Sequence, residues 1–267
     1  MSYSFFIPEN FKNQIGELTE FLKSMCTQNR YEKFLNVLSN RSKNVITVFE
    51  NTHHAHNISA IIRSVDSFGF MNILFLYSLE NMKFRASDSI DRGSSQWLFI
   101  QHKNKISETA DYLKNSGYKI ACVTLPDFSR TSQNYLHHIP AFSTNELNSK
   151  KFTECLKESK IALIFGSELI GISEEWKNYV DLYIYVDMYG FSESLNVSVC
   201  AALILQSLRN FFEKNNCLLK YTEIEKKIIM DYWMSRDYLH SETLIQNKKK
   251  ELFDYYLFVK KGLFFLK

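Results

Sequence analysis

The sequence predicts an α/β fold, a parallel sheet with helices on both faces. Three observations predict it. Of the 267 residues 45% are hydrophobic, enough for a sizeable core. Short apolar, β-branched runs recur from Val45 onward, and stretches with helical spacing separate them. Strands that are apolar on both faces and alternate with helices are typical of a covered parallel sheet. The expected strands are 45–49, 72–77, 98–100, 118–125, 161–165 and 182–186.

Residues typical of helix ends occur at positions that agree with this order of strands and helices. Asn57 is expected to cap a helix that Gly69 ends, and Gly117 is expected to close the helix before it. A long helix is expected over 195–212. No G-x-G-x-x-G follows the first strand, which disfavours a Rossmann dinucleotide site.

Helical segments are expected at both ends of the chain. Apolar residues at spacings near 3, 4 and 7 within 5–42 indicate two amphipathic helices. The tyrosine- and lysine-rich segment after Phe212 has no strand pattern. We therefore expect an N-terminal helical arm (1–43), an α/β domain (44–210) and a C-terminal helical extension (211–267).

Composition disfavours several classes of protein. No apolar run approaches the roughly 20 residues of a bilayer-spanning helix, and the first residues do not resemble a secretory signal. We therefore expect a cytoplasmic protein without a membrane partner. Five widely spaced cysteines without C-x-x-C indicate neither a disulfide framework nor a zinc knuckle.

The net charge of +3 is too small to indicate a nucleic-acid partner by itself. The basic surplus lies after Arg209, where the lysines Lys248, Lys249 and Lys250 either contact phosphates or keep a helix soluble. Composition alone leaves both interpretations open.

Polar residues follow the expected strands in three segments, and open α/β sheets bind ligands at the carboxyl ends of their strands. The first segment, 49–69, contains Asn57 and Arg63. Arg63 interrupts an otherwise apolar helix, so it either pairs with an acid such as Asp66 or holds a phosphate or polarised hydroxyl. Three histidines precede it, and we interpret them as exposed or RNA-facing and expect no metal, since no further ligands converge. They are His53, His54 and His56.

The other two segments are 164–173 and 184–205. In the former, Gly166 permits a close backbone approach and Glu168 projects a carboxylate. In the latter, Ser194 and Asn196 stand where a helix begins, so their side chains and the free backbone N–H groups face the same cleft.

These segments together resemble a known family. The patterns N-x(5)-R at 57–63, G-S-E-x-x-G-I-S at 166–173 and M-x-G-x-x-x-S-L-N-V-S-V at 188–199 are similar to the three motifs of the SpoU branch of the SPOUT methyltransferases. The stretch from Arg85 to Trp97 resembles the TrmH-type tRNA enzymes in particular. Asp187 departs from the pattern, because the family commonly has proline there.

The resemblance implies an S-adenosylmethionine-dependent RNA 2′-O-methyltransferase, with S-adenosylhomocysteine as product and a tRNA D-loop guanosine as the favoured target. It also implies a trefoil knot over about 160–210 and a homodimer. The cofactor would be held mostly by main-chain groups. The residues carried over for it are Val123, Thr124, Leu125, Gly166, Val186, Met188 and Leu195.

The resemblance also assigns the reacting groups. Arg63 is expected to bind the phosphate next to the target ribose and stabilise the developing alkoxide, or to act as the base itself. Asn57 and Glu168 are expected to orient Arg63 and the RNA, while Ser194 and Asn196 complete the pocket wall. The expected RNA contacts are Arg41, Lys43, Arg85 and Arg92.

Two other functions are considered. A ribosomal-RNA 2′-O-methyltransferase would use the same three motifs, but such enzymes often carry a compact RNA-binding domain ahead of the catalytic core, and the residues before Val45 are expected to be helical. An RNA-binding protein that has lost catalysis is the second alternative. The intact motif residues argue against it.

Overall fold

The computed structural model describes residues 5–52, 54–78, 93–125, 139–156, 160–167, 170–237 and 241–262. The chain forms two compact units. We call Ser42–Leu219 the sheet unit, and Tyr3–Arg41 together with Lys220–Lys267 the helical unit. Most of the expected arm (3–41) and most of the expected extension (220–267) therefore share one unit. The expected boundary at 210 falls inside a helix that continues to Lys214.

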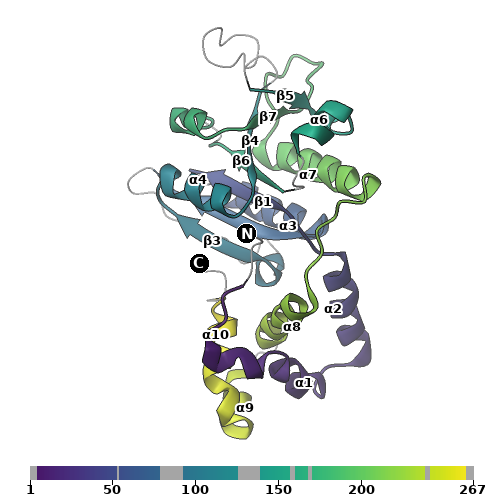
Figure 1. Cartoon of the computed structure of the whole chain (residues 1–267), viewed down its shortest axis with the longest axis vertical. Helices are drawn as coiled ribbons and strands as arrows, with labels where there is room; N and C mark the ends of the chain where they lie inside the picture. The colour runs from purple at the N-terminus through teal and green to yellow at the C-terminus, as the bar shows by residue number, and fades with distance from the viewer. Residues whose placement is uncertain are drawn as a thin grey trace. The chain divides into compact units, whose positions relative to one another are not determined.

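Parallel strands form the centre of the sheet unit (Figure 1). Their order in the sheet is β3-β2-β1-β6-β4-β7-β5, and every pair is parallel. The predicted parallel α/β sheet and its six predicted strands are confirmed, while the three-residue β5 was not predicted. The strands are β1 (Ser42–Glu50), β2 (Phe70–Leu76), β3 (Phe99–Lys103), β4 (Lys119–Thr124), β5 (Ala141–Ser143), β6 (Ile161–Phe165) and β7 (Leu182–Tyr185).

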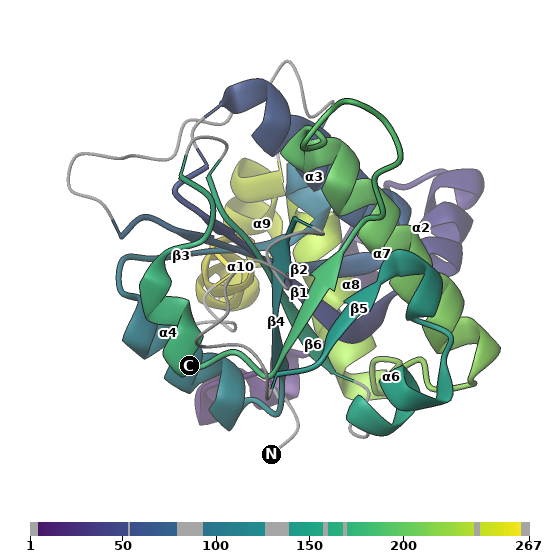
Figure 2. The same ribbon diagram turned by 90° about the horizontal axis from the view of Figure 1, so that it is seen from above.

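Helices cover both faces of this sheet (Figure 2). Side chains alternate between two cores: Val45 and Phe49 of β1 join the first, and Ile46 and Val48 the second. Phe49 stacks on Phe165 with ring centroids 5.2 Å apart, and burial of one such side chain contributes about 1.5–3 kcal/mol. The first core contains α3 (Ala55–Ser67), α6 (Lys150–Cys155) and α7 (Val197–Lys214), and the second contains α4 (Ile106–Asn115) and the 3₁₀ helix η4 (Glu174–Asn178). Two further 3₁₀ helices are η2 (Ser94–Trp97) and η3 (Thr144–Glu146).

The ends of α3 correct one prediction and confirm another. Asn57 is not the N-cap, because the helix begins at Ala55 with His54 in that position. At the other end, Gly69 adopts φ 76°, a left-handed conformation that glycine accepts readily, and it ends the helix as predicted.

The start of α7 also differs from expectation. The helix begins at Val197, two residues later than predicted, because Asn196 is its N-cap and accepts the Ser198 N–H at 2.9 Å.

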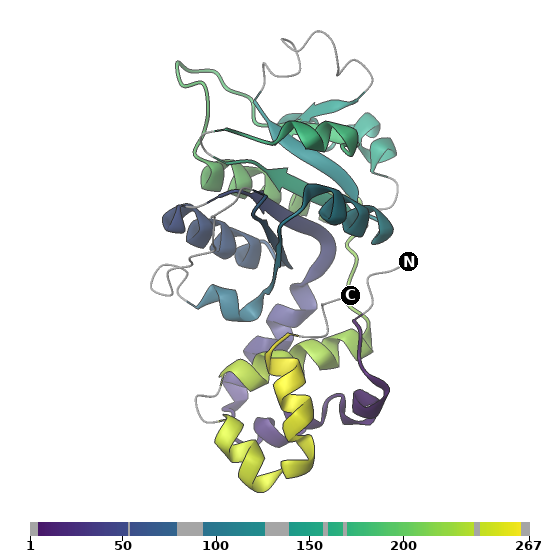
Figure 3. The ribbon, with the colours of Figure 1, turned by 90° about the vertical axis from the view of Figure 1, so that its left-hand side faces the viewer.

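The helical unit joins the two ends of the chain. Figure 3 shows the purple N-terminal helices beside the yellow-green C-terminal ones. Asp231 binds them together: its buried carboxylate accepts the backbone N–H groups of Gly16 (2.6 Å) and Thr19 (2.8 Å), the Thr19 hydroxyl (2.7 Å) and the Tyr255 hydroxyl (2.8 Å). Asp231 thus caps α1 from a helix far along the chain. The elements are η1 (Glu9–Gln14), α1 (Glu17–Lys23), α2 (Gln28–Asn40), α8 (Glu223–Asp237), α9 (Ser241–Lys248), η5 (Lys250–Leu252) and α10 (Phe253–Lys260).

Among the helices described, none combines the length and the apolar character that a bilayer crossing requires.

Candidate functional site

Three neighbouring strands bring the expected cofactor segments to one edge of the sheet. β4 lies between β6 and β7, and the register pairs Cys122 with Ile164 and Thr124 with Tyr185. The carboxyl ends of these three strands therefore meet. Val123 and Thr124 end β4, Gly166 follows β6, and the segment from Val186 follows β7.

This edge presents apolar surface that the fold does not cover completely. Val123, Val186, Met188 and Leu195 are half-buried, and the Leu125 side chain is 48% exposed. Three apolar residues on the loops around them are still more exposed, namely Ile170, Tyr189 and Phe191. Partly exposed apolar side chains beside main-chain polar groups are typical of small-molecule sites.

The turn after β6 requires glycine. A Cβ atom at Gly166 would lie 2.0 Å from the carbonyl carbon of Gly171 and 2.3 Å from the nitrogen of Ile172. Ser167 and Gly171 close the turn with two backbone hydrogen bonds of 3.0 and 2.9 Å. The predicted close backbone approach at Gly166 is confirmed, and the approaching backbone belongs to its own loop.

A hydrogen bond connects the first and third motifs. The side-chain amide of Asn196 donates to Oδ1 of Asn57 at 3.0 Å. The side-chain oxygen Oδ1 of Asn196 accepts hydrogen bonds from the backbone N–H and the hydroxyl of Ser198, at 2.9 and 2.6 Å. Both the nitrogen and the oxygen of the Asn196 side chain are therefore hydrogen-bonded, and the start of α7 is fixed against α3, on which α7 packs.

Arg63 is exposed on α3. Within the described part of the chain, its guanidinium has no hydrogen bond or ion pair, so the alternative of a pair with Asp66 is not observed there. Arg63 lies six residues after Asn57, about 9 Å along the helix axis. Within the described residues, Arg63 makes no hydrogen bond to Asn57, Asn196 or the exposed Ser194. Its charge is thus available to an external partner.

The structure does not describe all of the residues that were expected to orient or contact the RNA. Glu168, Arg85, Arg92 and His53 lie outside the described residues. Lys43 is half-buried in β1.

The expected RNA contact of Arg41 does not fit its position. Arg41 is 2% exposed, and its guanidinium lies 5.6 Å from the centroid of the Trp233 ring. This side chain is buried on an aromatic ring, so it is not presented to a phosphate in this structure.

Sequence reasoning missed a buried acid at the same edge. Glu50, the last residue of β1, is 0% exposed. Its carboxylate accepts the Ser173 N–H at 3.0 Å and also the Ser173 hydroxyl, and the Ser78 hydroxyl lies 3.4 Å away. The next residue, Asn51, exchanges two hydrogen bonds of 2.9 and 3.0 Å with Ser78. The signal in the sequence was an acid directly after an otherwise apolar strand.

Burial raises the pKa of two side chains near this edge. It raises the pKa of Tyr77 to about 12, and the Tyr77 hydroxyl donates to the Thr52 carbonyl at 3.4 Å. It also raises the pKa of Cys200, one turn into α7, to about 11. At neutral pH Cys200 is therefore a thiol and not a thiolate nucleophile.

No group of three or more histidine, cysteine or carboxylate side chains stands ready to hold a metal ion in the described ranges.

Comparison with known families identifies the fold and these motifs. The model of the SpoU rRNA Methylase family matches residues 44–206. The chain belongs to this family. The resemblance inferred from the three motifs is thereby confirmed, and the matched range includes Asn57, Arg63, Gly166 and Asn196.

Two relatives that match this SpoU family member nearly end to end have the names of tRNA enzymes. The tRNA (guanosine(18)-2′-O)-methyltransferase of Aquifex aeolicus is 28% identical over 233 residues, which cover 86% of this chain and 98% of the relative. The enzyme of the same name from Borreliella burgdorferi is 27% identical, with 85% and 97% covered. The crystal structure of the Aquifex aeolicus TrmH/SpoU tRNA modifying enzyme matches with a TM-score of 0.65 and 27% identity, over 79% of this chain and 98% of that one.

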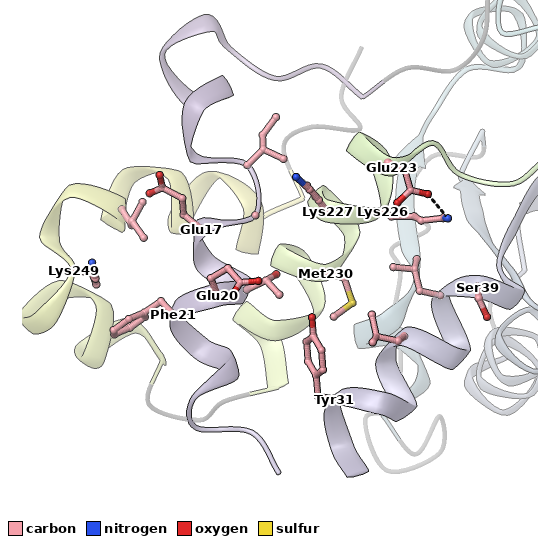
Figure 4. A pocket seen from close by; sticks show the side chains of 16 residues that line it. Glu17, Glu20, Phe21, Tyr31, Ser39, Glu223, Lys226, Lys227, Met230 and Lys249 are labelled. Atoms are coloured by element: carbon pink, nitrogen blue, oxygen red, sulfur yellow. Dashed lines mark hydrogen bonds and ion pairs between the residues drawn. The ribbon is translucent and has the colours of Figure 1, made fainter. Parts of the chain in front are cut away.

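The SpoU family member also has a cavity of about 790 Å³ within its helical unit (Figure 4). Figure 4 shows the Tyr31 side chain directed toward Met230, with the Lys226–Glu223 ion pair (2.6 Å) at one side. The positive and negative charges among the residues that line this cavity are equal in number, so charge does not indicate a phosphate ligand. The charged lining residues are Glu17, Glu20, Glu223, Lys226, Lys227 and Lys249. All the motif residues lie in the other unit.

Proposed function

We propose that this protein transfers a methyl group from S-adenosylmethionine to the ribose 2′-hydroxyl of a tRNA guanosine in the D-loop. One observation carries the proposal: the Asn196–Asn57 hydrogen bond joins the first and third family motifs beside the edge where β4, β6 and β7 end. The names of relatives that match nearly end to end support tRNA as substrate. Such a reaction would take place in the cytoplasm.

The residues at the sheet edge fit the cofactor. An adenine ring and a thioether chain need apolar cover and main-chain partners, and both are available around Val123–Leu125, Gly166 and Val186–Leu195. When bound, S-adenosylmethionine supplies a methyl group on a positively charged sulfur. The protein must hold the ribose oxygen in line with that methyl group and manage its proton.

We assign the proton and charge management to Arg63. A guanidinium remains charged in water and offers a planar fork of donors to a phosphate. Arg63 is exposed to solvent. It would bind the phosphate next to the target ribose and stabilise the developing alkoxide, with that phosphate assisting removal of the proton. Asn57 and Glu168 would orient Arg63 and the RNA, and Ser194 and Asn196 would complete the pocket wall. Lys43, Arg85 and Arg92 would contact the RNA backbone.

A homodimer and the family's trefoil knot over about 160–210 belong to the same proposal. Val199 and Leu203 are 47% and 39% exposed, and they stand one turn apart on the same side of α7. An apolar stripe on a helix that begins at the candidate site supports a second copy of the chain as its partner.

The test is methylation of total tRNA and total rRNA with labelled S-adenosylmethionine, followed by mapping of the modified nucleotide. We expect label in tRNA, on the 2′-oxygen of a D-loop guanosine. Label in rRNA alone would contradict the tRNA assignment and favour the ribosomal alternative. Absence of label, together with absence of cofactor binding by isothermal titration, would favour an inactive RNA-binding homologue.

A further inference from the structure

Glu50 occupies an unusual position for a carboxylate. It ends the buried strand β1, its exposure is 0%, and the contacts of its side chain are with loops that follow other strands. A buried carboxylate costs free energy unless hydrogen bonds compensate the lost hydration. Here two donors come from Ser173, after β6, and one from Ser78, after β2. β2 and β6 are the two neighbours of β1 in the sheet.

The contacts of Glu50 lead directly to the turn after β6. Ser173 follows Ile172, whose nitrogen would lie 2.3 Å from a Cβ at Gly166. Gly171, one residue earlier, closes the turn with Ser167 through two backbone hydrogen bonds. The turn is thus packed against itself, and Glu50 holds its far end through both the N–H and the hydroxyl of Ser173. Moving Ser173 would move the backbone against which Gly166 is packed.

A second branch of contacts leads to the loop after β2. Asn51 adopts a left-handed conformation (φ 50°) and exchanges two hydrogen bonds with Ser78, whose hydroxyl also faces Glu50. Ser78 immediately precedes the sequence that contains Arg85 and Arg92. One acid therefore contacts both the turn expected to bind the cofactor and the start of the segment expected to contact RNA.

We propose that Glu50 is a positioning residue for methyl transfer, which through Ser173 holds the backbone around Gly166 and Gly171 in its cofactor-binding form. The inference rests on the proposed function, and Glu50 acts through Ser173 without touching the reacting atoms. A carboxylate suits this role because both of its oxygens only accept, and Ser173 presents two donors. The amide of glutamine has one accepting oxygen, so its NH₂ group would face a donor.

The test compares Glu50→Gln, Ser173→Ala and Ser173→Thr with the full-length wild-type protein. Ser173→Ala removes the hydroxyl and keeps the backbone N–H, whereas Ser173→Thr keeps both. Asp181→Asn is the matched control, because Asp181 is another carboxylate of the sheet unit that accepts a backbone N–H (that of Ile120, 2.8 Å), but at the amino edge of the sheet. The readouts are S-adenosylmethionine affinity by isothermal titration, kcat and KM for tRNA, and deuterium exchange of the 160–178 peptide.

We expect Glu50→Gln to weaken S-adenosylmethionine affinity by about 10- to 100-fold, the range that follows from losing a charge-assisted hydrogen bond. Exchange in the 160–178 peptide should become faster in the same variant. Ser173→Ala should show a smaller loss and Ser173→Thr wild-type affinity, while Asp181→Asn should leave cofactor affinity unchanged. A purely structural role would instead lower thermal stability and leave the cofactor affinity of the folded fraction intact.

A folded Glu50→Gln protein with cofactor affinity within about twofold of wild type, which is below 0.5 kcal/mol, would overturn the proposal. If Glu50→Gln does not fold, Ser173→Ala decides in the same way. A wild-type protein that neither binds S-adenosylmethionine nor methylates RNA would refute the proposed function. Deuterium exchange would still report separately whether Glu50 holds the turn.

Discussion

The side-chain amide of Asn196 donates a hydrogen bond to Oδ1 of Asn57 at 3.0 Å, although the two residues are 139 positions apart. The same Asn196 side chain caps α7 through the Ser198 N–H. One residue therefore has two separable roles. It fixes the start of a helix, and it connects that helix to α3.

Asn196→Asp and Asn196→Ala separate these roles. Aspartate keeps the cap on α7 but has no N–H for Asn57, so we expect near-normal stability with kcat/KM lowered by about tenfold, in line with one hydrogen bond. Alanine loses the cap as well and should lower the free energy of unfolding by about 1 kcal/mol. Urea titration and steady-state kinetics check both. Equal kinetics for Asn196→Asp and wild type would contradict a role for the Asn57 contact.

Replacing Arg63 by alanine should lower methyl transfer by orders of magnitude and leave S-adenosylmethionine affinity almost unchanged. Arg63 is exposed and makes no hydrogen bond or ion pair within the described part of the chain, so the free energy of unfolding should change by less than about 0.5 kcal/mol. Single-turnover methylation and isothermal titration are the measurements. Arg63→Lys is the companion variant, and it should recover little activity because an ammonium lacks the planar fork. Near-normal turnover of Arg63→Ala would refute the assignment.

Asp231 should make stability depend on pH. Burial raises its pKa from 3.8 to about 6, against four hydrogen bonds that lower it. Because the pKa of Asp231 is higher in the folded than in the unfolded state, its contribution to the free energy of unfolding is fully present below about pH 4. That contribution is lost as the pH rises through about 6. The loss is about 3 kcal/mol, from roughly two pH units.

The measurement is the free energy of unfolding from pH 4 to 8 for wild type and Asp231→Asn. The wild-type curve should fall by this amount relative to that of Asp231→Asn. Asp254→Asn, an exposed position on α10, serves as control and should follow wild type. Parallel curves for wild type and Asp231→Asn would exclude the effect.

Introducing a charge on α7 should separate the proposed homodimer. Leu203→Lys places an ammonium in the exposed apolar stripe, so we expect a monomer in sedimentation equilibrium at micromolar concentration. Asp111→Lys, exposed on α4 on the other face of the sheet, introduces the same side chain and should stay dimeric. A wild-type monomer at that concentration would contradict the dimer itself.

The carboxylate of Asp187 accepts a hydrogen bond from the Asn145 side-chain amide at 2.9 Å. This contact joins the segment after β7 to η3. We expect Asp187→Ala to weaken S-adenosylmethionine binding by a few-fold, because an exposed polar contact contributes under about 1 kcal/mol. Asn145→Ala should have the same effect, and the double variant should add nothing. Isothermal titration of the three variants tests this, and additive losses would show that the two residues act independently.

Local patterns predicted the elements that local forces determine. The six longer strands follow from continuous apolar runs, and the end of α3 follows from the left-handed conformation of Gly69. Strand β5 is only three residues long, too short to stand out. Asn57 is a residue type that often caps helices, but in this structure its side-chain oxygen accepts a hydrogen bond from Asn196. The Glu50–Ser173 contact joins residues 123 positions apart, so no local pattern indicates it. Arg41 looks like a surface cation until its stacking on Trp233 is known.

The Asp231 contacts have a consequence for the order of events during synthesis. Gly16 and Thr19 leave the ribosome long before Asp231 and Tyr255 exist, so α1 has no partner for its first N–H groups while the sheet unit is being made. A nascent chain that has reached Leu219 contains every strand that the structure describes but only the first part of the helical unit. The helical unit can close only after Asp231 and Tyr255 have been synthesised, and until then the N-terminal helices are exposed to chaperones and proteases.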